Sequence, residues 1–158
     1  MDIDTLKTVK SGKDCFFPQC EVLYKSRYEG GKVSIDPAEL QNQPFVVFGL
    51  RACDVRAVKV LDNVFLTDPV DTYYAARREQ GTIVSLACKE PDETCFCKNF
   101  DVDAAEPGTD VETWFVGDTV YWKSLTEKGE TLTAFVKEAL ADSFTEAAAE
   151  GEKKVEEQ

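Results

Sequence analysis

Two short apolar runs, each leading to a cysteine, constrain the fold of this 158-residue chain more than any other feature. The first is Phe45–Leu50, which is followed by Cys53; the second, Thr82–Cys88, ends in the cysteine itself. Continuous apolar runs of this length are typical of strands buried on both faces. Between them, apolar residues from Val55 to Phe65 recur at helical spacing, which predicts a helix that starts near Asp54, a residue type favoured at helix N-caps.

A strand, a helical connection and a second strand favour a parallel pair, because the connection returns the chain to the same end of the sheet. A further helix, predicted over residues 71–79 and ended by Gly81, lengthens this connection. Both cysteines are then expected at the carboxyl edge of the sheet, which is where open α/β folds build their sites.

The remaining elements complete the prediction of fold class and domain limits. The fold class is α/β: a small mixed sheet with a parallel βαβ core, a C-terminal hairpin and a terminal helix. The elements predicted outside the core are an irregular stretch over 15–28, a turn at Gly30–Gly31, a strand over 32–35, a hairpin over 111–122 that turns at Gly117–Asp118, and a helix capped by Thr131 whose apolar face reaches Phe144. We expect a flexible lead-in over 1–14, one cysteine-cluster domain over 15–142 and an acidic tail over 143–158.

Composition excludes several classes of function. The chain carries 18 Lys and Arg against 30 Asp and Glu, a net charge of −12, which repels nucleic acids and anionic lipid surfaces. It contains no histidine. Ser-His and Cys-His catalytic pairs and His-ligated metal sites are therefore excluded.

The six cysteines are too few for a secreted disulfide scaffold of this length. The acidic start, Met1–Thr5, lacks the basic and apolar segments of a signal peptide, and the longest apolar run, Phe45–Leu50, is far too short to span a membrane. We therefore expect a cytoplasmic, reducing setting, in which clustered cysteines are more often metal ligands or redox groups than crosslinks.

The candidate site consists of four cysteines: Cys53, Cys88, Cys95 and Cys97. Four thiolates on loops at one sheet edge suit a tetrahedral zinc ion or an iron–sulfur cluster. The spacing matches neither the ferredoxin runs nor the paired C-x2-C of zinc ribbons, so spacing alone leaves open that Cys53 and Cys88 are ordinary core residues. Cys15 and Cys20, with Pro18 between them, are interpreted as a stray pair.

Five ordered blocks of residues carry a resemblance to a known family. The blocks are Gly49–Asp54, Leu61–Phe65, Asp71–Arg78, Ala87–Cys88 and Cys95–Cys97. Together, over roughly residues 16–130, they resemble the N-terminal domain of the iron–sulfur electron-transfer subunits typified by the beta subunit of sulfhydrogenase and by the corresponding subunit of anaerobic sulfite reductase. Five blocks in the same order are much more specific than any one of them.

The resemblance implies a cytoplasmic, non-catalytic electron-transfer subunit of an anaerobic redox complex, of the hydrogenase, sulfite reductase or heterodisulfide reductase-like kind. Carried over residue by residue, Cys53, Cys88, Cys95 and Cys97 are the implied ligands of one iron–sulfur cluster, 4Fe–4S in preference to 2Fe–2S. The implied partners are flavin or iron–sulfur oxidoreductase subunits. Family members usually continue into a ferredoxin-like domain with two C-x2-C-x2-C-x3-C runs, which this sequence lacks. We therefore expect a single-domain relative or a fragment.

Two interpretations from other classes stay open. One is a zinc-stabilised structural or adaptor module that uses the same four thiolates. The other is a thiol–disulfide redox protein that uses Cys95 with Cys97, or Cys15 with Cys20.

Two further groups of residues receive structural interpretations. Tyr73–Tyr74 and Arg77–Arg78 are assigned to an amphipathic helix with its aromatic rings inward and its arginines in solvent. Trp114 and Trp122 are assigned to packing across the predicted hairpin.

Overall fold

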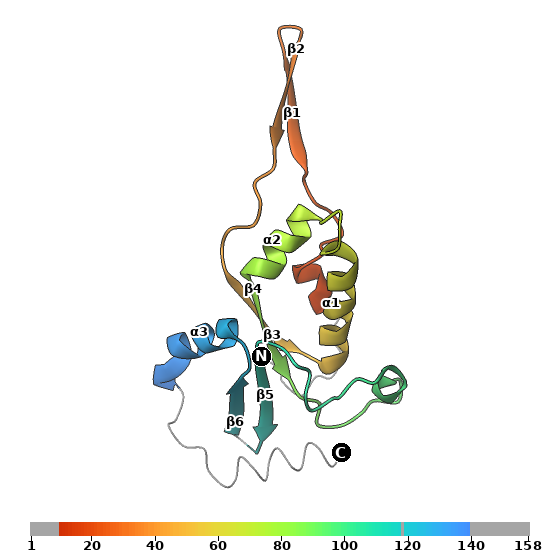
Figure 1. Ribbon diagram of the computed structural model, residues 1–158, viewed down its shortest axis with the longest axis vertical. Helices are drawn as coiled ribbons and strands as arrows, with labels where there is room; N and C mark the ends of the chain where they lie inside the picture. Colours follow the sequence, from red (N-terminus) through yellow and green to blue (C-terminus); the bar gives the residue numbers. More distant parts are fainter. Residues whose placement is uncertain (1–9, 118, 140–158) are drawn as a thin grey trace.

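The computed structural model of the chain describes residues 10–117 and 119–139 (Figure 1). Its helices and strands are β1 (Tyr24–Glu29), β2 (Lys32–Pro37), β3 (Phe45–Leu50), α1 (Ala52–Phe65), α2 (Thr72–Gln80), β4 (Gly81–Leu86), β5 (Val111–Val116), β6 (Thr119–Ser124) and α3 (Glu127–Val136), with 3-10 turns at Gly12–Cys15, Cys97–Phe100 and Lys137–Ala139. The predicted α/β class, with a mixed sheet and a terminal helix, is confirmed.

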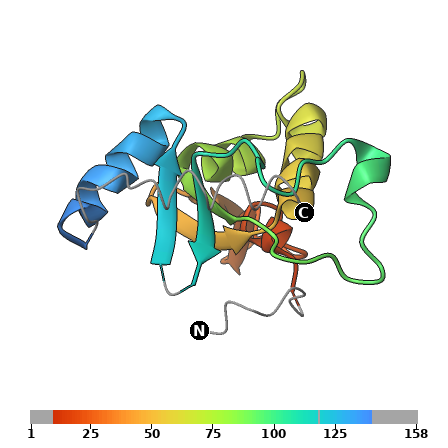
Figure 2. The same cartoon turned by 90° about the horizontal axis from the view of Figure 1, so that it is seen from below.

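The main sheet has the strand order β3-β4-β5-β6. β3 and β4 are adjacent and parallel, as predicted, and β5 adds a second parallel pairing that the sequence did not indicate. β6 runs antiparallel to β5 and forms the predicted hairpin. The carboxyl ends of β3, β4 and β5 therefore lie at one edge of the sheet, and the long loop after β4 leaves from that edge (Figure 2).

β3 lies at the edge of the sheet and is covered on one face only. Its burial alternates along the strand, with Val46 and Phe48 exposed and Phe45 and Val47 half-buried. The prediction of burial on both faces is therefore wrong for β3, because an apolar run does not reveal which faces its neighbours cover. It is right for β4, the inner strand, where Ile83–Leu86 is buried.

The core joins β4 to α1 and α2. It consists of Phe16, Leu50, Val55, Val58, Tyr74 and Ile83. α1 begins at Ala52, two residues before the predicted start, and its N-cap is Arg51 rather than Asp54. Phe16, from the stretch before β1, is fully buried and lies under the Arg78 guanidinium, which is 5.2 Å from the ring centroid.

A polar network links α1 to α2 at Asp62. Its carboxylate accepts hydrogen bonds from Tyr74 Oη at 2.6 Å and from Arg78 Nε and Nη2 at 2.7 and 3.0 Å. Burial alone would raise the pKa of Asp62, but these hydrogen bonds outweigh burial and hold the pKa below its ordinary value. Tyr74 is buried, as predicted. The interpretation of Arg77 and Arg78 as solvated is wrong, because Arg77 pairs with Glu21 and Arg78 with Asp62, partners that helical periodicity does not reveal.

We expect Asp62→Ala to lower the free energy of unfolding by about 2–3 kcal/mol, because it leaves a phenol and a guanidinium partly buried without their acceptor. Tyr74→Phe, the matched control, removes one of these bonds and is expected to cost about 1 kcal/mol. The Asp62 contribution is fully present above the ordinary carboxyl pKa of about 4 and is lost as the pH falls through the lowered pKa of the folded state. Urea unfolding at pH 7 and at pH 3 measures both effects; equal losses for the two variants at pH 7 would contradict the network.

β1 and β2 form an antiparallel ribbon that projects beyond α2 (Figure 1). The register pairs Tyr28 with Val33 and puts Tyr24 and Ile35 on the same face. These four side chains are 60–73% exposed, so within the described residues the apolar face of the ribbon is uncovered. The strand at 32–35 is confirmed, but the irregular assignment of residues 24–28 is wrong. The sequence of β1 gives little strand signal, because Tyr24 and Tyr28 are its only large apolar residues.

The two tryptophans of the hairpin behave differently. Trp114 stacks on Tyr121 of the opposite strand, with ring centroids 5.8 Å apart, which confirms the predicted cross-strand packing. Trp122 instead uses its indole N–H to donate a hydrogen bond to Thr133 Oγ1 of α3 at 2.8 Å. Trp122 therefore joins the hairpin to the last helix.

α3 begins earlier than predicted. Thr126, not Thr131, is its N-cap, and the Thr126 hydroxyl accepts a hydrogen bond from the Gly129 N–H at 3.2 Å. The Thr131 hydroxyl donates to the Glu127 carbonyl inside the helix. The predicted extension to Phe144 lies outside the described residues, as do the acidic tail and most of the lead-in.

Candidate metal centre

Both parallel strands of the predicted core deliver a cysteine to the same edge of the sheet. Cys53 lies in the first turn of α1, just after β3 ends at Leu50, and Cys88 follows the end of β4 at Leu86. Cys53 is exposed and Cys88 is half-buried. The free backbone N–H groups and the dipole of a first helical turn favour an ionised thiol at Cys53.

A single arginine connects these two strand ends. Arg51 Nη1 donates hydrogen bonds to the carbonyl oxygens of Ala87 at 2.9 Å and Leu86 at 3.4 Å. On the other side, the Ala87 N–H donates to the Thr113 carbonyl of β5 at 2.8 Å. The residue before Cys88 is therefore held from both neighbouring strands.

The loop after Cys88 turns back on itself and carries the other two candidate ligands. The Cys88 N–H donates to the Ala104 carbonyl at 3.4 Å, and the Cys95 N–H donates to the Asp92 carbonyl at 2.9 Å. In return, the Asp92 N–H donates to Cys95 Sγ at 3.2 Å. Cys97 then begins the 3-10 turn Cys97–Phe100, the short helical segment of this loop in Figure 2. A backbone N–H directed at a sulfur is one way in which proteins stabilise a thiolate ligand.

Burial and nearby charges shift the pKa of Cys88 and of Cys53. Burial raises the pKa of Cys88 most; the Arg51 charge lowers it, and Cys53, Cys97 and Cys95 raise it further. Burial also raises the pKa of Cys53, followed by the neighbouring carboxylate and by Cys97. The structure thus places Cys53 and Cys88 at one edge of the sheet, with Cys95 and Cys97 on the loop that follows Cys88.

The described residues contain no ready-made metal site. Across residues 10–117 and 119–139, no group of three or more Cys, Asp or Glu side chains lies close enough together to hold a metal ion. The donor chemistry fits, since thiolates are the ligands that iron–sulfur clusters and structural zinc sites use. Ligand sulfurs of one centre lie about 4–7 Å apart, a spacing that three or more of these thiols do not share in the described part of the chain.

Cys15 and Cys20 are both exposed, and none of the six cysteines forms a disulfide. Cys15 ends a 3-10 turn that is held beside α1, where Ser11 Oγ donates to Asp54 Oδ1 at 3.3 Å and Lys13 Nζ lies 3.9 Å from the same oxygen. The interpretation of Cys15 and Cys20 as a stray pair stays a prediction.

Sequence reasoning missed two groups at this edge. Arg51 belongs to the block Gly49–Asp54, yet nothing in the sequence says that its side chain reaches the carbonyls at the end of β4. The Asp92 N–H on Cys95 is a backbone group, which leaves no signal in side-chain identity. The sequence signal that could have indicated a role for Arg51 was its position between the apolar run Phe45–Leu50 and Cys53.

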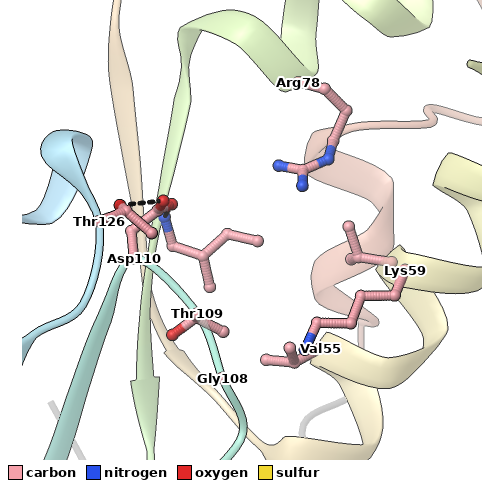
Figure 3. Close-up of a pocket in the computed structure, with 9 residues that line it drawn as sticks. Val55, Lys59, Arg78, Gly108, Thr109, Asp110 and Thr126 are labelled. Carbon is pink, nitrogen blue, oxygen red and sulfur yellow. Dashed lines mark hydrogen bonds between the residues drawn. The ribbon is translucent and has the colours of Figure 1, made fainter.

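A pocket of about 200 Å³ lies between α1 and the segment over 108–110 (Figure 3). Its charged groups are already engaged: Lys59 Nζ donates to the Pro107 carbonyl at 3.0 Å, Arg78 binds Asp62, and the Asp110 carboxylate accepts the Thr126 hydroxyl at 2.7 Å. No cysteine lines it. We therefore do not assign the redox function to this pocket.

Glu112 of β5 is a buried carboxyl group, only 3% exposed. Burial raises its pKa, against the Gly108 N–H, which donates to Oε1 at 2.7 Å, and against the Lys123 charge. Because the folded state then binds this proton more tightly than the unfolded state does, the free energy of unfolding falls as the pH rises from about 4 through the raised pKa.

We expect Glu112→Gln to stabilise the fold at pH 7 by about 1 kcal/mol, because the amide oxygen still accepts the Gly108 N–H and no charge is buried. The variant should also lose the part of the pH dependence that Glu112 contributes. Thermal unfolding from pH 5 to pH 8 measures both, with the exposed Glu39→Gln as the control. A variant less stable than the parent at pH 7 would show that the ionised carboxylate is needed.

Comparison with known proteins identifies a relative. The chain is 35% identical over 112 residues to sulfhydrogenase 2 subunit beta of Pyrococcus furiosus, an alignment that covers 70% of this chain and 31% of the relative. The chain thus spans about a third of that protein's length. No family model and no solved structure matches it. Within the described parts of the chain, no helix has the length and hydrophobicity needed to cross a membrane.

Proposed function

Because the chain is related, over a partial domain, to the sulfhydrogenase beta subunit family, we propose that it is an electron-transfer subunit, or a domain of one, in a hydrogenase-like redox complex. In this proposal Cys53, Cys88, Cys95 and Cys97 bind one iron–sulfur cluster, 4Fe–4S in preference to 2Fe–2S. The observation that carries the proposal is that the parallel strands β3 and β4 end beside Cys53 and Cys88 at one edge of the sheet, and that the loop with Cys95 and Cys97 leaves from that edge.

The residues around the thiols support this role. Cys53 lies in the first turn of α1, the Asp92 N–H donates a hydrogen bond to Cys95 Sγ, and Arg51 supplies a positive charge beside Cys88. When bound, a cluster supplies a centre that accepts and donates single electrons. An electron relay of this kind needs no catalytic side chain, in keeping with a sequence that lacks histidine. Six reduced thiols suit a cytoplasmic location.

Metal analysis tests the proposal directly. Protein produced and purified without oxygen is expected to be brown and to contain about four iron and four sulfide ions per chain. About one zinc ion per chain in a colourless protein would replace the proposal with the zinc-stabilised adaptor. A metal-free protein that loses free thiols on mild oxidation would replace it with the thiol–disulfide protein.

We further propose that the chain docks onto a flavin or iron–sulfur oxidoreductase subunit. Two observations support a partner: the relative is named as a subunit, and the β1–β2 ribbon exposes an apolar face that carries Tyr24, Tyr28, Val33 and Ile35. Anaerobic co-purification at low salt is expected to yield such a subunit. Recovery of the cluster-loaded chain alone would contradict docking and leave the cluster proposal standing.

A further inference from the structure

We infer that Arg51 is a positioning residue for the thiolate site and also sets its reduction potential through its charge. The inference rests on the proposed function, because it concerns the same four thiols. It starts from what the Arg51 side chain does in the structure: it is the link between the segment that carries Cys53 and the segment that carries Cys88.

The backbone and the side chain of Arg51 serve different elements. Its carbonyl accepts the first helical hydrogen bond of α1, from the Val55 N–H at 3.0 Å, so its backbone fixes the start of the helix on which Cys53 lies. Its side chain makes no N-cap hydrogen bond. The guanidinium instead reaches the Ala87 and Leu86 carbonyls.

The hydrogen bonds leave little freedom at the end of β4. The Ala87 N–H is bound to Thr113 and its carbonyl to Arg51, at 2.8 and 2.9 Å. Both backbone polar groups of Ala87 are thus hydrogen-bonded, and this fixes the position of the next residue, Cys88. Residues that fix metal ligands in this way contribute to metal affinity without touching the metal.

The charge of Arg51 also lies close to Cys88. The guanidinium is hydrogen-bonded to the carbonyl of Ala87, the residue before Cys88, so a fixed positive charge lies beside this candidate ligand. A centre held by four thiolates gains negative charge when it takes up an electron, and a nearby fixed positive charge stabilises that reduced form. Removal of the charge should therefore make the reduction potential more negative.

Three substitutions separate position from charge. Arg51→Gln keeps a donor for the Ala87 carbonyl without a charge, Arg51→Lys keeps the charge without the planar fork, and Arg51→Met keeps neither. Arg27→Gln on the exposed β1 strand is the matched control. The measurements are iron and sulfide content and an anaerobic redox titration followed by electron paramagnetic resonance.

We expect Arg51→Gln and Arg51→Met to lower the reduction equilibrium constant at least tenfold, a shift of about 59 mV for a one-electron couple, while Arg51→Lys and Arg27→Gln stay close to the parent. Arg51→Met should also retain less iron than Arg51→Gln. A parental potential in Arg51→Gln overturns the charge role. A parental iron and sulfide content in Arg51→Met overturns the positioning role. A parent protein without iron and sulfide overturns the proposed function itself, which is a different result.

Discussion

Cys88→Ser is expected to abolish cluster binding, with iron and sulfide falling more than tenfold from about four of each per chain. Cys88 follows Ala87, whose N–H and carbonyl are both hydrogen-bonded, so the backbone that carries this thiol is fixed at the end of β4. A serine hydroxyl is a harder, far less acidic donor than a thiol, so it does not replace a thiolate on iron. Serine is nearly isosteric with cysteine, and Cys88 is only half-buried. The circular dichroism spectrum of the variant should therefore be unchanged.

Cys15→Ser and Cys20→Ser are the matched controls for this loss. Both cysteines are exposed and precede β1, so both variants are expected to keep the parental iron and sulfide content. Retention of iron in Cys88→Ser would exclude this residue as a ligand. Loss of iron in Cys15→Ser would instead bring the turn Gly12–Cys15, which lies beside Asp54, into the site.

The parallel core could be predicted because its signals are strong and local. The run 45–50 is apolar throughout, and the run 82–88 contains only Thr82 and Ser85 as polar residues. The helical spacing between Val55 and Phe65 indicates a helical connection between the two strands. β1 could not be predicted, since Ser26 interrupts the alternation between Tyr24 and Tyr28 and the strand has no other large apolar residue. Nor could the edge position of β3, which depends on the strand order of the sheet.

The site could be predicted to the level of its cysteines and no further. Strand ends place Cys53 and Cys88 at one edge, but the distance from them to Cys95 and Cys97 depends on the path of a polar loop. That path is set by backbone hydrogen bonds such as Cys88 to Ala104, whose partners do not depend on side-chain identity. Whether the four thiols close around one centre is therefore a question for metal analysis.

A steric contact between α3 and the start of β5 explains one glycine that a helix would not otherwise favour. Gly129 is buried in the first half of α3, and a Cβ at this position would lie 2.0 Å from the Asp110 carbonyl oxygen and 3.1 Å from Val111 Cγ2. Asp110 cannot move aside easily. Its carbonyl accepts the Leu125 N–H at 2.9 Å, and its carboxylate accepts the Ile83 N–H at 2.9 Å.

Gly129→Ala is therefore expected to destabilise the fold by about 3 kcal/mol or more, even though alanine is better than glycine inside a helix by about 1 kcal/mol. For a domain of this size the midpoint of thermal unfolding should fall by roughly 10 °C. Gly30→Ala is the control of opposite kind: Gly30 has a φ of +57° but nothing within 4 Å of its Cβ position, so only backbone strain of about 1 kcal/mol is expected. Differential scanning calorimetry measures the unfolding temperatures of both variants and of the parent. If Gly129→Ala unfolds at a higher temperature than the parent, helix propensity outweighs the contact and α3 does not pack this closely on Asp110.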